Sequence, residues 1–173
     1  MAQDKLNIFI VDDDDMYLQV LKHHIEKKFN AVVHTYTTSE ICLTNLHLNP
    51  EIIILDYALN SVYHDAMDGI AMLKEINKRN ENSGREIYSI MLTKQDDVQV
   101  AVDTMKNGAY DYIIKGLTAD KRLEIVIKNI SKQILMKKNL EEARAMKKIM
   151  LLVALSIVTL SFVLYFIYPK ITH

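Results

Sequence analysis

The first 117 residues alternate short, mostly apolar runs with longer segments in which apolar residues recur every three or four positions. Apolar runs bounded on both sides by helical spacing are typical of strands in a parallel sheet that is covered on both faces. The pattern predicts five strands, at 6–11, 31–36, 51–55, 87–92 and 110–114.

Helical spacing fills the intervals between these strands. Leu18, Leu21 and Ile25, for example, fall on one face of a helix over 15–28. The other predicted helices cover 39–48, a segment that begins near Gly69, and 98–106. Strands that alternate with helices in this way predict a doubly wound α/β domain with a five-stranded parallel sheet, in which ligands bind at the carboxyl ends of the strands.

No further strand is predicted from Thr118 onward. Leu123, Ile127, Ile130 and Ile134 keep helical spacing, and charged residues then dominate to Lys148. This segment is either a fifth helix that continues as a basic stalk or a helix followed by a looser linker. The apolar positions of a coiled coil fail after Ile134, so a homodimer is open but is not specified by the pattern.

Residues 149–168 form an uncharged apolar segment of 20 residues. As a helix it would be about 30 Å long, which matches the hydrocarbon core of a bilayer. A buried core helix is the alternative, but so small a chain has no second core to cover it. We therefore expect a single transmembrane helix.

The flanks of this segment predict its orientation. Basic residues precede it and Tyr165 and Tyr168 lie near its far end, so the residues before it should lie on the cytoplasmic side. The sequence thus divides into a globular domain at 1–117, a stalk at 118–148, a membrane helix at 149–168 and a short tail at 169–173.

Charge follows the same division. Residues 1–117 carry 18 acidic and 11 basic side chains, whereas residues 118–148 carry 4 acidic and 9 basic ones. The acidic domain would repel phosphate backbones, so nucleic-acid binding is disfavoured.

Cys42 is the only cysteine and is expected to be a small buried residue. The N-terminus has no apolar stretch typical of a secretory signal.

Polar residues gather at the predicted strand ends. Four aspartates, residues 12–15, follow the first strand and Asp56 follows the third, while Thr93 and Lys115 end the fourth and fifth. In a sheet of this kind strands one, three, four and five lie side by side, so these groups should converge. Asp14 and Asp15 are explained as the cap and first-turn acids of the following helix.

The sequence runs IFIVDDD, IIILD, IMLT and GAYDYIIK resemble the receiver domain of two-component response regulators, which has the CheY-like fold. The resemblance implies that Asp56 is the phosphoacceptor, that Thr93 and Lys115 contact the phosphoryl group, and that Tyr112 is a switch residue. It also implies a Mg²⁺ site formed by Asp12, Asp13, Asp56 and the carbonyl of Ala58. A hard divalent cation would relieve the repulsion among clustered carboxylates.

Three features depart from the receiver pattern. The Asp68–Gly69 pair comes about five residues later than usual, so loop 57–68 is longer and could gate the site or contact a partner. Gly116 replaces the usual cis-proline, which suggests a turn that depends on the conformational freedom of glycine. Lys94 replaces a small residue after Thr93, and we expect its bulk to slow access of water or a phosphatase to the phosphoryl group.

The resemblance predicts a switch that accepts a phosphoryl group from a histidine kinase or phosphotransfer protein. We expect no enzymatic activity beyond self-catalysed phosphotransfer and slow autodephosphorylation. We expect no DNA-binding or enzymatic output module, so the signal would pass to an unknown downstream protein at the membrane, or the domain would remove phosphate from another regulator.

Two other functions are compatible with parts of the sequence. An aspartate-nucleophile phosphatase of the haloacid-dehalogenase type carries D-x-D-x-[TV] after its first strand, but here Met16 occupies the Thr or Val position. A receiver-like adaptor that works without phosphorylation is the third hypothesis, which Lys94 and Gly116 favour.

Overall fold

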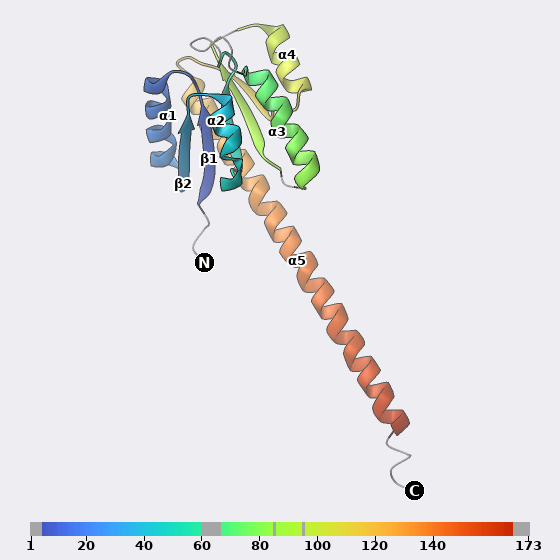
Figure 1. The fold of residues 1–173 in the computed structure, drawn as a ribbon. Helices are drawn as coiled ribbons and strands as arrows, with labels where there is room; N and C mark the ends of the chain where they lie inside the picture. Colours follow the sequence, from blue (N-terminus) through green and yellow to red (C-terminus); the bar gives the residue numbers. More distant parts are fainter. Residues whose placement is uncertain (1–4, 60–66, 85, 95, 168–173) are drawn as a thin grey trace. The chain divides into compact units, whose positions relative to one another are not determined.

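The computed structural model describes residues 5–59, 67–84, 86–94 and 96–167. The chain divides into two compact units, residues 1–130 and 131–173. In the first unit strands and helices alternate, as the sequence predicts (Figure 1). The strands are β1 (Leu6–Val11), β2 (Ala31–Tyr36), β3 (Ile52–Asp56), β4 (Tyr88–Thr93) and β5 (Asp111–Ile114). The helices are α1 (Asp15–Lys28), α2 (Ser39–Thr44), the 3-10 helix η1 (Leu46–Leu48), α3 (Gly69–Ser83), α4 (Val98–Lys106) and α5 (Ala119–Ile167).

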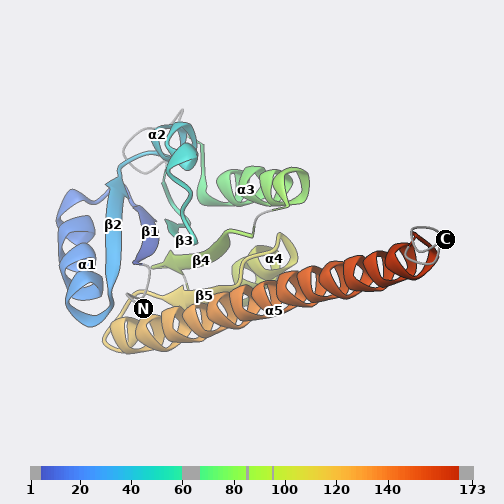
Figure 2. The same cartoon turned by 90° about the horizontal axis from the view of Figure 1, so that it is seen from below.

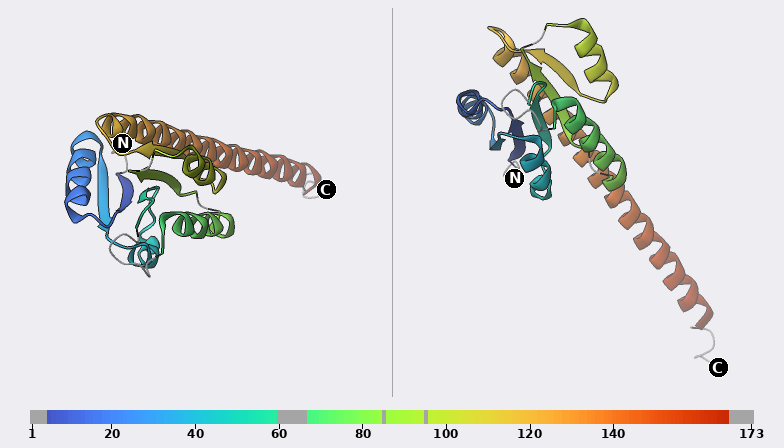
Figure 3. Two further views of the ribbon diagram at one scale, coloured as in Figure 1. Left: turned by 90° about the horizontal axis from the view of Figure 1, so that it is seen from above. Right: turned by 45° about the horizontal axis from the view of Figure 1, so that its top comes forward.

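The five strands form one parallel sheet in the order β2-β1-β3-β4-β5. Helix α1 and the first turns of α5 cover one face, whereas α2 and α3 cover the other (Figures 2 and 3). Both faces are therefore buried, and this explains why β3 and β4 are buried along their whole length.

Alternate strand residues supply the two halves of the core. Phe9, Ile53 and Met91 belong to a cluster that also includes Cys42 of α2 and Met72 of α3. Cys42 is fully buried, as predicted, and burial raises its pKa to about 12. The neighbouring strand residues Ile8, Ile10 and Ile54 are also buried, as are the apolar stripes of α1 and α5.

Side-chain caps start four of the helices. Asp14, Thr38, Asp68 and Asp97 each accept a hydrogen bond from a backbone N–H in the first turn of the helix that follows. The role predicted for Asp14 is thus confirmed, and Asp15 lies in the first turn of α1.

One predicted helix is broken. The segment expected to be helical over 39–48 stops at Thr44, because Asn45 caps it. The backbone N–H of Asn45 donates to the carbonyl of Cys42 at 3.0 Å, and its side-chain amide donates to the carbonyl of Ile41 at 2.8 Å. The chain then continues as η1.

Helix α5 is continuous from Ala119 to Ile167, so the looser linker considered from the sequence is not formed. Leu123, Ile127 and Ile130 are buried in the first unit. In the second unit the described side chains are exposed from Leu135 to Tyr165. None of the helix's most apolar stretch is buried, so by length and composition it is a candidate membrane span. The predicted tail at 169–173 lies outside the described residues.

Candidate functional site

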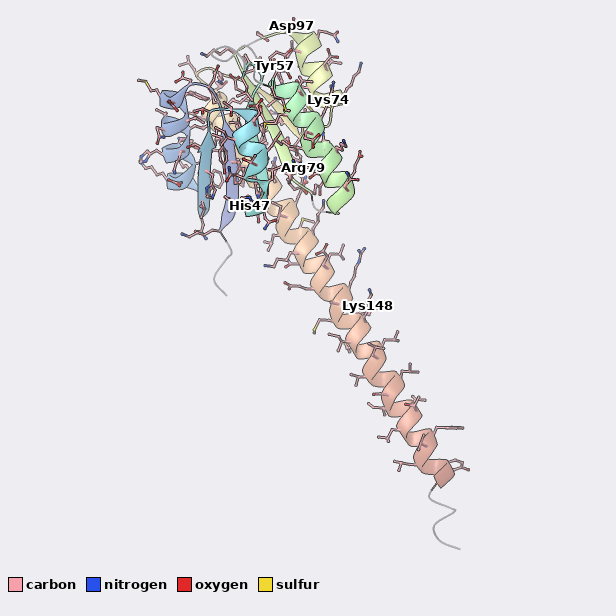
Figure 4. All side chains as sticks on the ribbon, in the orientation of Figure 1. His47, Tyr57, Lys74, Arg79, Asp97 and Lys148 are labelled. Carbon is pink, nitrogen blue, oxygen red and sulfur yellow. The ribbon has the colours of Figure 1, made fainter. Side chains whose placement is uncertain are left out.

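The predicted polar groups lie at the carboxyl edge of four adjacent strands. Asp12 follows β1, Asp56 and Thr93 are the last residues of β3 and β4, and Lys115 follows β5. Register pairs Val11 with Leu55, Asp56 with Leu92, and Thr93 with Ile114. In Figure 4, Tyr57, which directly follows Asp56, and Asp97 lie toward one end of the unit, and His47 lies toward the other end. Parallel pairing therefore brings these groups together, as the sequence predicts.

Three carboxylates form the acidic part of the site. Oxygen atoms of Asp12, Asp13 and Asp56 all lie within 4.8 Å of one another. Asp12 and Asp56 are buried, with 2% and 7% of their surfaces exposed, whereas Asp13 is partly exposed. Such a set of oxygen ligands suits Mg²⁺, which is commonly bound through one or two carboxylates and waters.

Lys115 is the cation of the site. Its Nζ lies 2.6 Å from Oδ2 of Asp12 and 3.3 Å from Oδ1 of Asp56, and its side chain is 8% exposed. The backbone N–H of Lys115 donates to the carbonyl of Thr93 at 2.7 Å, which continues the β4–β5 pairing to this residue. The two strands thus hold the lysine at the acidic cluster.

The charge of Asp56 is only partly compensated. Burial raises the pKa of its carboxyl, Lys115 opposes this increase, and the neighbouring Asp12 adds to it. Oδ1 of Asp56 is buried without a hydrogen-bond partner among the described residues. An oxygen in this state is suited to bind a cation or to react.

The start of α1 fixes the two aspartates that follow β1. Oδ1 of Asp12 accepts a hydrogen bond from the backbone N–H of Asp14 at 3.0 Å, and Oδ1 of Asp14 accepts one from the N–H of Tyr17 at 3.0 Å. Asp12 is therefore oriented by the same turn that caps the helix.

Gly69 supports the site in a way that the sequence did not reveal. In the sequence the Asp68–Gly69 pair differs from the receiver pattern only in its late position, but a Cβ on Gly69 would collide with the backbone carbonyl of Asp56. The N–H of Gly69 also donates to the carbonyl of Tyr57 at 3.2 Å. Glycine thus allows α3 to begin directly against the end of β3. Of the longer loop predicted at 57–68, residues 60–66 lie outside the described residues.

The remaining predicted residues lie on β4 and β5 or shortly after β3 and β4. Thr93 is buried at 1% exposure, Ala58 is partly exposed and Lys94 is exposed. Tyr112 is partly buried and packs against the core cluster. Burial raises the pKa of its phenol, and the negative charges of Asp96 and Asp97 raise it further. Their predicted roles in ligand binding and switching remain predictions.

The expectation for Gly116 is wrong in one respect. Gly84 and Gly108 are the glycines with a positive φ among the described residues, so the turn after Lys115 does not use the left-handed conformation at Gly116. A Cβ at Gly116 would meet no atom within 4 Å. This backbone conformation and the free space are compatible with other residues, so glycine is not required there.

Tyr17 is the site neighbour that the sequence analysis missed. Its ring centroid lies 4.6 Å from Nζ of Lys115. The helical spacing of α1 places Tyr17 beside the buried Leu18, but only the fold brings β5 close to this turn.

The sequence matches the response regulator receiver domain family over residues 8–128. It is 34% identical over 119 residues to the two-component response regulator ORR27 of rice, a match that covers 67% of this chain and 17% of the rice protein. It is 30% identical over 131 residues to the transcriptional regulatory protein ZraR of Salmonella typhimurium, covering 76% of this chain and 28% of that protein. The chain thus matches less than a third of the length of these relatives.

Solved structures agree with this assignment. A response regulator receiver domain protein from Clostridium thermocellum superposes with a TM-score of 0.63 at 27% identity, over 76% of this chain and 98% of that one. The receiver domain of the Francisella response regulator 1452 has the same fold, with a TM-score of 0.64 at 23% identity over 75% and 99% of the two chains. The strand order, the acidic edge of the sheet and these matches together place the chain in the response regulator receiver family.

Proposed function

We propose that this chain is a phospho-accepting receiver of a two-component system, phosphorylated on Asp56 in a Mg²⁺-dependent reaction. The burial and the contacts of the Asp56 carboxylate support this proposal most directly. Its Oδ1 is buried, has no hydrogen-bond partner among the described residues, and lies 3.3 Å from the Lys115 ammonium. The donor would be a phosphohistidine of a histidine kinase or phosphotransfer protein, as is general for the family.

In the proposed reaction, Asp56 carries out a nucleophilic displacement at phosphorus. A carboxylate oxygen of Asp56 forms a bond to phosphorus, the phosphorus–nitrogen bond of the donor breaks, and the departing imidazole takes up a proton. Lys115 offsets negative charge on the phosphoryl oxygens, and the Thr93 hydroxyl donates a hydrogen bond to one of them. The product is an acyl phosphate on Asp56.

The residues at the site fit a Mg²⁺ ion. Asp12, Asp13 and Asp56 supply clustered carboxylate oxygens, one of which has no hydrogen-bond partner in the described part of the chain. The Ala58 carbonyl would complete the protein ligands. When bound, Mg²⁺ supplies positive charge that offsets the repulsion among these carboxylates and the phosphoryl oxygens.

Tyr112 and the elements around it would transmit the phosphorylated state to a partner. Movement of Thr93 toward the phosphoryl group would open space for the Tyr112 ring, which packs against the edge of the core cluster. The surface formed by α4, β5 and the start of α5 would change with it, as a shift between two populations. A downstream protein that binds this surface would read the phosphorylated state.

The apolar half of α5 supports tethering to a membrane. We propose that residues 149–168 cross the bilayer once and that the receiver domain lies on the cytoplasmic side. The helix has the required length and composition. Arg144, Lys147 and Lys148 directly precede the apolar segment (Lys148 is labelled in Figure 4), which favours this orientation.

Intact-mass measurement after incubation with acetyl phosphate tests the central claim. In the presence of Mg²⁺ we expect the wild-type protein to gain one phosphoryl group, because acetyl phosphate replaces the phosphohistidine donor. Asp56→Asn should gain none, and Asp15→Asn, which changes an exposed first-turn acid of α1, should behave like wild type. The adduct should disappear when EDTA removes the metal.

Failure of the wild-type protein to gain the group would contradict the proposal and would favour the phosphorylation-independent adaptor. An adduct that persists in Asp56→Asn would place the phosphoacceptor elsewhere.

A further inference from the structure

The aromatic ring beside Lys115 has no role in the chemistry described above. Three groups of the described chain surround the Lys115 ammonium: Oδ2 of Asp12 at 2.6 Å, Oδ1 of Asp56 at 3.3 Å, and the Tyr17 ring centroid at 4.6 Å. We propose that Tyr17 is a positioning residue, whose ring holds the Lys115 ammonium where it can meet the phosphoryl group on Asp56. The inference rests on the proposed function of Asp56.

The local structure of α1 gives Tyr17 a defined place. Its backbone N–H donates to the cap residue Asp14, and the next residue, Leu18, is 2% exposed. The helix therefore cannot rotate Tyr17 away from Lys115 without exposing its own buried stripe and breaking its cap. The ring is partly buried itself, so few alternative side-chain positions are open to it.

Electrostatics explains why a ring is useful at this point. With 8% of the side chain exposed, the Lys115 ammonium has little contact with water, and the carboxylate of Asp12 lies closer to it than that of Asp56. An aromatic face attracts a cation through its quadrupole without adding another negative charge to a crowded acidic site.

The tyrosine is suited to this role because it stays neutral. Burial raises the pKa of the Tyr17 phenol, and the negative charges of Asp120, Asp12, Asp56 and Asp14 raise it further. A phenolate, which would form a direct ion pair and add to the repulsion, is therefore disfavoured, and the interaction is that of a ring face with an ammonium.

Replacing the ring separates this role from general packing. In the whole chain in detergent micelles, with acetyl phosphate and Mg²⁺, Tyr17→Leu should phosphorylate roughly fivefold more slowly than wild type, as expected for loss of one cation–π contact to a partly buried ring. Tyr17→Phe keeps the ring and should stay within about twofold of wild type. Met16→Leu, an adjacent change at an exposed position of α1, is the matched control.

A spectroscopic measurement reports the contact independently of activity. An ammonium above a ring face places the neighbouring ε-methylene protons in the ring's shielding region. In ¹³C-lysine-labelled protein the Lys115 ε-methylene signal, assigned by its loss in Lys115→Arg, should lie upfield of those of the other lysines. The upfield shift should persist in Tyr17→Phe and vanish in Tyr17→Leu.

The outcomes distinguish this inference from the proposed function. A Lys115 signal that coincides with those of exposed lysines in the wild-type protein would overturn the positioning role, whatever the variants do. A Tyr17→Leu protein that phosphorylates as fast as wild type would also overturn it. A wild-type protein that shows the upfield signal but takes no phosphoryl group would instead contradict the proposed function of Asp56.

Discussion

At the scale of single residues, the site brings buried like charges together with one cation. Asp12 and Asp56 are almost fully buried, and Lys115 contacts both. One ammonium cannot neutralise three clustered carboxylates, so the metal-free site retains uncompensated negative charge. This is the arrangement expected of a site that binds a divalent cation.

The raised pKa of Asp56 predicts how stability depends on pH without metal. In EDTA, the charged form of Asp56 is disfavoured in the folded protein relative to the unfolded chain. The free energy of unfolding should therefore rise as pH falls through the raised pKa toward the ordinary value of 3.8, and the gain should be lost as pH increases.

The measurement is thermal unfolding of wild type and Asp56→Asn over this pH range. The difference between the two should favour the variant most at neutral pH and shrink on acidification, because asparagine does not titrate. Mg²⁺ added at neutral pH should stabilise wild type more than the variant. A difference independent of pH would show that the Asp56 carboxyl has its ordinary pKa in the fold.

At the scale of the elements, the site depends on where helices begin against strand ends. The start of α1 orients Asp12, and α3 begins at Gly69 directly against the backbone of Asp56. The sequence predicted the capping role of Asp14 because capping is a local property. The close approach at Gly69 could not be predicted in this way, since it depends on how α3 packs against β3.

Two glycine substitutions test this distinction. Gly69→Ala should destabilise the domain by about 1–3 kcal/mol and slow phosphorylation, because the new Cβ displaces the Asp56 carbonyl. Gly116→Ala should change stability by no more than about 0.5 kcal/mol, since its Cβ enters open space at a position without positive φ.

Unfolding of both variants can be followed by the near-ultraviolet circular dichroism of the tyrosines, and phosphorylation by intact mass. Equal stability of the two variants would show that α3 can move away from β3 to accommodate the added methyl group at little cost.

At the scale of the whole molecule, the chain joins a compact α/β unit to a long apolar helix segment. The first unit buries its apolar residues, whereas none of the most apolar stretch of α5 is buried within the protein. Exposed apolar surface of this extent is stable in hydrocarbon and costly in water.

Membrane insertion is tested by charge placed in the middle of this segment. An Ile157→Arg, Val158→Arg double variant should be released from membranes by alkaline carbonate, because each central arginine costs about 2.5–3.5 kcal/mol on insertion scales. Wild type should remain in the membrane pellet. Leu140→Arg, a similar change at an exposed position before the apolar segment, should also remain. Release of wild-type protein would mean that the helix does not span a bilayer.

The order of the elements, the sheet type, the family resemblance and the identity of the acidic residues could all be predicted from the sequence. These are encoded by local periodicity, by capping residues and by residue types at strand ends, all of which can be read from neighbouring positions. The contact of the Tyr17 ring with Lys115, the close approach of Gly69 to Asp56 and the absence of a positive φ at Gly116 could be seen only in the folded chain. Each of these depends on contacts between segments far apart in the chain or on the backbone path between them, and the packing of the whole domain fixes both.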